Sequence, residues 1–411
     1  MAGLQAAGVI AAALPFGIFL SLRMSRWLLP LDILAIGGLL VLGSSLGAGG
    51  SLLDLPIPNL AVRTLHALAH GLAAPAFVTA PLERRRPAAI LRGAGLALPL
   101  LVVLGLLLAS ADAVFAGFFR WWSPSTVIGH AVLLGIGAWG MVGLLRVTSA
   151  EPAPAAPRLP YRLGQVEATV VVGSLLALFA AFAVAQVVAL SGGGRHVLRT
   201  AGLTYAEYAR TGFFQLLAVA TITLISLIGL RAVTDLSHQA HARRFTVMSE
   251  AAIALTMVIV AVALRRLGLY QDAYGLTMLR LYSSVFAVWI GVVLVLAGLG
   301  LAGVAAERAW FPAAAAVAGL ALLLGLNIAN PEAMVVRHNV DRAVSTQKVD
   351  PAYLAELSDD AVPELVRALP RLPEPARQEV LDAVCASSER SFDGWAAANT
   401  SRRQVCRPGV D

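Results

Sequence analysis

Long runs of apolar residues recur along most of this chain. In a bilayer, a helix of about 20 apolar residues spans the roughly 30 Å of hydrocarbon, and the backbone must satisfy its own hydrogen bonds there. The runs therefore predict an all-α fold, a polytopic helical membrane bundle with about 10 transmembrane helices. Their approximate limits are Leu4–Leu22, Leu28–Gly47, Leu60–Ala80, Gly93–Phe118, Thr126–Leu145, Val166–Leu190, Phe213–Leu230, Thr246–Leu264, Leu281–Ala302 and Phe311–Ile328.

The composition agrees with a chain embedded in lipid. Hydrophobic residues make up 58% of the 411 residues and charged residues only 13%, whereas about a quarter of the residues in a soluble domain are charged. The net charge of +7 comes from arginines near the apolar runs, as is common in membrane proteins. Because no basic stripe lies on a soluble domain, nucleic acid is excluded as a partner. The lipid bilayer is the partner that the composition predicts.

Prolines and a change in composition divide the chain into four predicted parts. Residues 1–147 hold about five N-terminal transmembrane helices, and residues 148–164 form a Pro-rich linker loop. Residues 165–329 hold about five more transmembrane helices with two Tyr-rich interfacial segments. Residues 330–411 have the composition of a helical soluble tail. The expected architecture is thus a bundle with a small helical C-terminal domain.

The tail shows several helix signals. At Asn330–Glu332 a proline falls in the first turn and an acid follows near the positive helix end, which is typical of a helix start. Ser358–Asp360 predicts a second start, and a third helix is expected over Pro375–Ser388. A domain of this size builds only a small core, so we expect it to dock on the bundle.

The only two cysteines also lie in the tail, at Cys385 and Cys406. If the tail lies outside the cytoplasm, these two residues can form a disulfide. The alternative is two unrelated reduced thiols, because sequence alone does not give their geometry.

Five of the seven tyrosines fall in two short segments between apolar runs, Gly202–Arg210 and Tyr270–Tyr282. Each segment combines tyrosine, one acid, an arginine and a Gly-Leu-Thr. Concentrated polar chemistry is costly next to lipid unless it is satisfied and positioned. Eight residues therefore make up the candidate functional surface: Tyr205, Glu207, Tyr208, Arg210, Tyr270, Asp272, Tyr274 and Arg280.

Two interpretations of this surface stay open. In one, the segments form a polar lip that binds a ligand or a protein partner at the extracytoplasmic face. In the other, they are interfacial helices whose tyrosines belong to the aromatic belt and whose charges form structural ion pairs. A further hypothesis pairs the segments crosswise, Glu207 with Arg280 and Asp272 with Arg210.

Arginine counts give an orientation. If alternate loops face the cytoplasm, one set of loops holds 13 arginines, including Arg23 and Arg26, and the other set holds 7. The positive-inside rule places the larger set in the cytoplasm. Both tyrosine segments and the tail are then extracytoplasmic. Abundant alanine and a single lysine, Lys348, are typical of a GC-rich bacterial genome, so the expected location is the bacterial plasma (inner) membrane.

Histidines offer weak candidates for a metal site. His66 and His70 are four residues apart, one helical turn, and two histidines at this spacing can ligate zinc. No third ligand is evident nearby, and histidines can instead hydrogen-bond across helices. The triplet Asp235, His238 and His241 is equally weak. We therefore predict neither a metal nor another cofactor.

Three stretches carry a resemblance to a known family: Gly202–Phe214, Tyr270–Arg280, and Asn330–Glu332 with Asn339. They resemble the bacterial integral membrane proteins known as domain of unknown function 4153/4173, and the likeness extends from Gln165 to Arg403. The resemblance implies a polytopic membrane protein with no assigned activity. Near Trp395 a Trp-Asn pair is expected in the family, whereas this chain has a run of alanines before Asn399.

The catalytic signatures of zinc proteases and of P-loop NTPases are absent: the sequence has no HExxH and no Walker motif. The leading hypothesis is an uncharacterised, non-enzymatic sensory or partner-binding membrane module. One alternative is a transporter of a small solute or ion, which needs ionisable groups near the bilayer midplane. Another alternative is an intramembrane enzyme acting on a lipid-linked substrate, with Glu207 or Asp272 as the acid or base.

Overall fold

The computed structural model describes residues 2–52, 55–72, 124–149, 163–188, 205–304, 309–374 and 376–388. Every element in these ranges is helical, apart from one bridge between Leu163 and Thr234. Seven of the described helical segments are long and apolar enough to cross a membrane. The all-α polytopic bundle predicted from the apolar runs is therefore confirmed. The chain divides into two compact units, residues 1–12 with 37–156 and residues 13–36 with 157–411, and each is described by itself.

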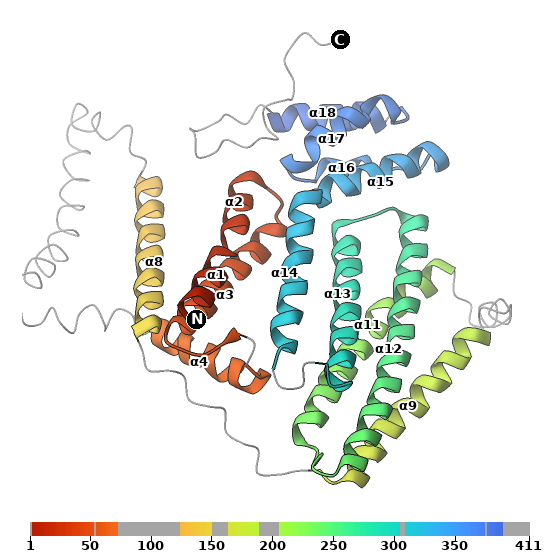
Figure 1. Cartoon of the computed structure of the whole chain (residues 1–411). Helices are drawn as coiled ribbons and strands as arrows, with labels where there is room; N and C mark the ends of the chain where they lie inside the picture. Colours follow the sequence, from red (N-terminus) through yellow and green to blue (C-terminus); the bar gives the residue numbers. More distant parts are fainter. Residues whose placement is uncertain are drawn as a thin grey trace, which may run out of the picture. The chain divides into compact units, whose positions relative to one another are not determined.

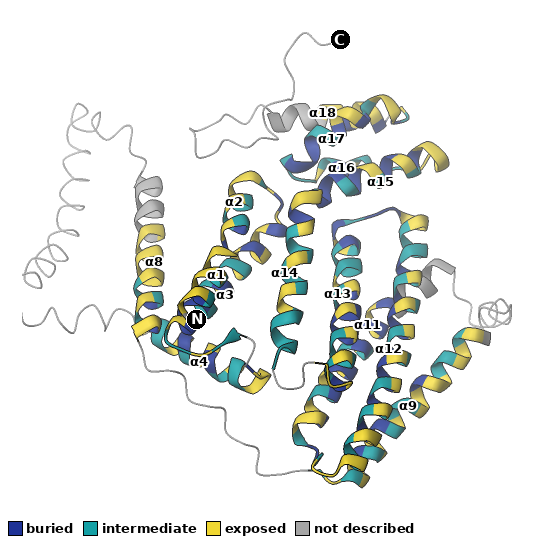
Figure 2. Cartoon of the chain, viewed as in Figure 1, coloured by how far each residue is buried: buried dark blue, intermediate teal, exposed yellow. Residues whose placement is uncertain are grey.

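Long helices form the body of the larger unit (Figure 1). They are α2 (Leu14–Leu22), the first part of α3 (Leu28–Gly47), α9 (Gln165–Val188), α11 (Tyr205–Val233), α12 (Gln239–Tyr274), α13 (Met278–Leu301) and α14 (Phe311–Ala329). Small and branched side chains on the facing sides of α9, α11, α12 and α13 make one apolar core. The outward sides expose leucine and valine (Figure 2), as expected for helices surrounded by lipid.

The tail forms four helices in the same unit, α15 (Pro331–Thr346), α16 (Pro351–Ala355), α17 (Val362–Ala368) and α18 (Ala376–Ser388), with short 3₁₀ turns at Asp359–Ala361 and Leu369–Arg371. The predicted helix starts are confirmed. The Asn330 side chain accepts from Ala333 N–H, and the Ser358 hydroxyl accepts from Asp360 N–H. The tail also has its own small core, which includes Val336, Val340, Leu354, Leu365 and Val380.

The smaller unit contains α1 (Ala2–Ala11), the second part of α3, α4 (Ile57–Leu72) and α8 (Pro124–Ser149). The buried Arg63 of α4 donates to Ser45 O at 2.9 Å and Gly49 O at 2.8 Å. It thereby satisfies carbonyls at the end of α3 that have no partner within the helix. The predicted span Gly93–Phe118 lies outside the described residues. The described part of Leu60–Ala80 belongs to α4, whose description ends at Leu72.

One prediction about sidedness is wrong. Counting arginines in alternate loops placed Arg23 and Arg26 on the opposite side of the membrane from the tail. In the structure, the backbone N–H groups of Met24 and Ser25 donate to Asp360 in the tail at 2.8 and 3.0 Å. The loop between α2 and α3 and the tail therefore share one side. The alternation assumed three crossings between α3 and α9, and residues 73–123 of this stretch lie outside the described part of the chain.

The side of each remaining end in the larger unit follows from local contacts. The α12–α13 turn bonds to the tail through Asn339, so it lies on the tail side. The opposite ends of α11 and α12 are joined by the short connection Thr234–His238. Leu163, just before α9, bonds backbone to backbone with Val233 and Asp235, so α9 begins on the side opposite the tail.

Candidate functional site

Polar side chains gather where the tail meets the helix ends, and we call this cluster the junction. It draws on the α2–α3 loop, the first turns of α3 and α13, the end of α14 and the beginning of the tail. In Figure 1 the tail helices lie beyond the end of α14 and next to the α12–α13 turn. The junction residues are Arg23, Ser25, Asp32, Tyr282, Asn327, Asn330, Glu332, Ser358 and Asp360.

Arg23 caps the end of α14. Its guanidinium donates to Asn327 O at 2.9 and 2.6 Å, and to Ile328 O at 3.3 Å. The last carbonyls of a helix lack partners within it, and a positive charge is favourable at the negative end of the helix dipole. Asn330 then ends α14 in the left-handed conformation, with φ at 55°. Its side chain caps α15, so one residue closes one helix and opens the next.

Asp360 ties the tail to the α2–α3 loop. Its side chain is 1% exposed, and Oδ2 accepts the Met24 and Ser25 N–H groups at 2.8 and 3.0 Å. Its backbone carbonyl accepts from Asn330 Nδ2 at 2.8 Å. A buried carboxylate is tolerated when such bonds replace the lost water. The loop, the end of α14 and the tail are thus joined in a closed ring of hydrogen bonds.

Two further buried acids complete the junction. Asp32 of α3 is 1% exposed and accepts from Asn327 Nδ2 at 2.8 Å. Glu332 of α15 is 2% exposed, and its Oε2 accepts from Ser358 N at 2.7 Å and Ser358 Oγ at 2.6 Å. Among the described residues, neither acid forms an ion pair. Burial raises the pKa of Glu332, against the lowering effect of its hydrogen bonds to Ser358.

Three buried oxygen atoms in the junction lack a hydrogen bond among the described residues. They are Ser25 Oγ, Tyr282 Oη and Asn327 Oδ1. Ser25 lies beside both Glu332 and Tyr282, and the Tyr282 ring stacks on Trp27 at 5.5 Å between centroids. Since buried polar groups in folded proteins are nearly always bonded, these atoms show where the junction can still take up a donor or an acceptor.

The second tyrosine segment lies next to the junction and is held by the tail. Asn339 of α15 accepts from Leu276 N at 2.8 Å and donates to Leu276 O at 2.7 Å. Met278 N–H donates to the Tyr353 hydroxyl at 2.8 Å. Arg342 donates to Asp272 O at 2.9 Å and to Ala273 O at 2.6 Å. The tail therefore forms five hydrogen bonds with the backbone of four residues at the α12–α13 turn.

The candidate residues of this segment have local partners. Arg280 donates to the carbonyls of Tyr274 and Gly275, and its guanidinium lies 4.1 Å from the centroid of the Tyr270 ring. The Tyr270 and Tyr274 rings are 5.0 Å apart. Asp272 takes part through its backbone carbonyl. The described contacts of Arg280 are thus a helix cap and a cation–π contact.

The first tyrosine segment opens α11, which begins at Tyr205. The side chains of Tyr205, Glu207, Tyr208 and Arg210 lie outside the described part of the chain. The crosswise pairs of Glu207 with Arg280 and of Asp272 with Arg210 therefore stay predictions.

The histidines and cysteines add little to the site. The rings of His66 and His70 are 4.1 Å apart, and His70 Nδ1 lies 2.9 Å from His66 O. In the described ranges, no group of three or more His, Cys, Asp or Glu side chains is arranged to hold a metal ion. Cys385 falls in α18, but its side chain and all of Cys406 lie outside the description, as does their predicted disulfide.

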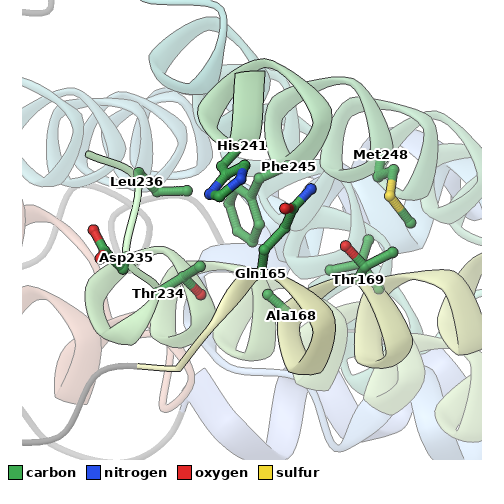
Figure 3. Close-up of a pocket in the computed structure, with 10 residues that line it drawn as sticks. Gln165, Ala168, Thr169, Thr234, Asp235, Leu236, His241, Phe245 and Met248 are labelled. Atoms are coloured by element: carbon green, nitrogen blue, oxygen red, sulfur yellow. The ribbon is translucent and has the colours of Figure 1, made fainter. Parts of the chain in front are cut away.

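A shallow hollow lies between α9, α11 and α12 at the end of the bundle away from the tail (Figure 3). Gln165, Ala168 and Thr169 of α9 face His241, Phe245 and Met248 of α12 across it, and Thr234 to Leu236 close one side. The rings of His238 and His241 meet edge to face at 5.1 Å. The hollow is mostly apolar and brings together few groups able to do chemistry.

Most of the junction was missed by reasoning from sequence. Glu332 is predicted only as a helix-start acid, and Asp32 lies within the predicted apolar run Leu28–Gly47. Tyr282 ends the second tyrosine segment, whereas Ser25 and Asn327 carry no signal of their own. The sequence signal for the junction lies in the residues taken together. Polar residues stand at the ends of several apolar runs, and these ends share one side.

Comparison with known proteins gives a family and no activity. No curated protein and no solved structure matches this chain. A family model described as a domain of unknown function, DUF4153, matches residues 7–368, so the match includes the early apolar runs and the tail as far as the end of α17. The chain belongs to the DUF4153 family.

Proposed function

We propose that this chain is a non-enzymatic membrane module that uses its docked helical tail as a sensory or partner-binding surface. The observation that carries the proposal is the attachment of the tail to several helix ends at once. Asp360 bonds to the α2–α3 loop, Asn339 and Arg342 bond to the α12–α13 turn, and α15 follows directly from α14. A change in the packing of these helices therefore reaches the tail through hydrogen bonds.

The distribution of ionisable residues supports a module more than a transporter. Transport sites need ionisable groups or broken helices near the midplane. In the described spans the acids stand towards the ends. Asp32 is in the first turns of α3, Glu167 is in the first turn of α9, and Glu250 precedes the apolar stretch Ala251–Leu264 of α12.

The outer surface of the tail suits a reversible partner. Arg337 and Arg367 both pair with Glu364, at 3.2 and 2.7 Å, and Arg371 pairs with Asp341 at 2.7 Å. The pair of Arg371 with Asp341 is exposed on both sides, and such a pair contributes little to stability, about 0–1 kcal/mol. It can therefore exchange for a pair with another protein at small cost, while the buried side of the tail stays on the bundle.

Photo-crosslinking in living cells tests this proposal. A photoreactive amino acid is placed at exposed tail positions, Arg367 or Glu379, and at the lipid-facing Leu178 of α9 as a control. We expect both tail positions to capture the same protein, and we expect the Asn339→Ala variant to capture less of it. Crosslinks to lipid alone, or equal capture from Leu178, would argue against a partner-binding tail.

We also propose that the tail lies outside a bacterial plasma membrane. Moving Arg23 and Arg26 to the tail side changes the arginine count from 13 against 7 to 11 against 9, provided that α4 does not cross the membrane. The positive-inside rule then still favours an extracytoplasmic tail. A membrane-impermeant thiol reagent, applied to intact cells with and without reductant, should label Cys385 and Cys406. Labelling only after permeabilisation would reverse the orientation.

A further inference from the structure

The junction holds three acids, Asp32, Glu332 and Asp360. Among the described residues, Asp32 and Glu332 form no ion pair. Asp32, Glu332 and Asp360 are each at most 2% exposed. Asp360 accepts two backbone N–H groups, which favour its charged form. Glu332 stands next to this charge, and like charges close together in a buried site raise the cost of ionising both.

In the described part of the chain, no surrounding cation forms an ion pair with Glu332 to offset that cost. Tyr282 of α13 lies near both Glu332 and Asp32, and Tyr353 of α16 lies near Glu332, Glu356 and Arg280. The guanidinium of Arg280 is bound to the α12–α13 turn, and that of Arg23 is bound to the end of α14. Both arginines are therefore engaged with backbone carbonyls. His338, the next titratable residue along α15 after Glu332 and Arg337, has a buried Nε2 without a bond among the described residues.

The hydroxyl group of Ser25 supplies the independent evidence for a ligand. Ser25 is 2% exposed and lies beside the Glu332 carboxyl group, yet its Oγ has no hydrogen-bond partner in the described part of the chain. Both printed bonds to Glu332 go to Oε2. A proton on Glu332 would turn this carboxyl group into a donor, and Ser25 Oγ is an acceptor without a donor.

We propose that the junction is a proton-binding site, in which Glu332 takes up a proton as the tail docks on the bundle. The neutral Glu332 donates to the Ser25 hydroxyl. Asp360 stays ionised and accepts the N–H groups of the α2–α3 loop. When Glu332 loses the proton, two negative charges share the buried site and the tail loosens. This inference deepens the proposed function, because it names the signal that a sensory tail would follow.

The sign of the pH dependence follows from the raised pKa of Glu332. An acid whose pKa is higher in the docked state binds more protons there. Docking is then favoured fully below the ordinary pKa of 4.5 and weakens as the pH rises towards the raised value. Within this window the docking equilibrium changes by at most about tenfold per pH unit.

Hydrogen exchange on the full-length protein in lipid nanodiscs tests the proposal. Four amides report docking because each bonds to a tail side chain: Met24, Ser25, Leu276 and Met278. We expect their protection, corrected for intrinsic exchange, to fall between pH 5 and pH 8. Glu332→Gln should abolish this dependence. The matched change Asp341→Asn, at a tail acid that is 63% exposed, should leave the dependence unchanged.

A second variant keeps the test decisive if Glu332→Gln fails to fold. Ser25→Ala removes the acceptor for the proton, so the loss of protection should move to lower pH. Protection that is flat with pH in the unmodified protein would overturn the proposal. If the protection of these amides depends on the sodium concentration at fixed pH, with choline as the control, then the site binds a metal cation and the proposal of a proton site is wrong. None of these measurements uses a partner protein, so failure here and failure of the crosslinking test are distinguishable.

Discussion

The side-chain amide of Asn339 pairs with the backbone of Leu276 as one peptide group pairs with another. Its Oδ1 accepts the Leu276 N–H at 2.8 Å and its Nδ2 donates to the Leu276 carbonyl at 2.7 Å. Both residues are buried, so water cannot replace either bond. The tail thus supplies, from a residue 63 positions away, the hydrogen bonds that the α12–α13 turn does not make for itself.

Replacing Asn339 by alanine should loosen the tail. The change leaves the Leu276 N–H and carbonyl unpaired in a buried place, at a cost of about 1–3 kcal/mol for each group. We expect faster hydrogen exchange at Leu276 and greater sensitivity of the tail to limited proteolysis. Gln378→Ala, at an exposed position of α18, is the control. Unchanged exchange at Leu276 would show that the amide pairing does not hold the tail.

Gly275→Ala should be destabilising for two separate reasons. The backbone of Gly275 has φ at +80°, which residues with a side chain rarely adopt, and an added Cβ would lie 2.5 Å from Asn339 Oδ1. The expected cost is about 1–3 kcal/mol from backbone strain alone. Gly268→Ala in α12 is the matched control, because nothing lies within 4 Å of its added Cβ and alanine favours a helix interior. Thermal unfolding of both variants in detergent should therefore give shifts of opposite sign.

The sequence predicts the helices well and the contacts between distant segments poorly. The run Leu28–Gly47 and the helix starts at Asn330 and Ser358 are recovered, because length, apolarity and capping residues are local signals. The bond between Asp32 and Asn327 joins residues 295 positions apart. Neither residue carries a pattern that identifies its partner, so only the packing of α3 against α14 reveals it.

Arg23→Ala should weaken the end of α14. The guanidinium satisfies the Asn327 and Ile328 carbonyls, and hydrogen bonds from charged groups contribute about 1.5–3 kcal/mol. We expect faster exchange at the α14–α15 boundary and a lower unfolding temperature. Arg26→Ala removes an equal charge from an exposed position of the same loop, and it should have little effect. Equal losses in the two variants would indicate a general effect of charge instead of capping.

The shared side of the α2–α3 loop and the tail predicts that α4 does not cross the membrane. If α3 crosses the membrane from the tail side, and because α9 begins on the side opposite the tail, we expect an even number of crossings between these two helices. The sequence offers three runs there, over 60–80, 93–118 and 126–145. The helix of the first run, α4, buries an arginine against carbonyls at the end of α3. Single cysteines at positions 51 and 85, in a chain lacking Cys385 and Cys406, should react with an impermeant maleimide from one common side. Labelling from opposite sides would make α4 a span and require one of the two later runs to stay out of the membrane.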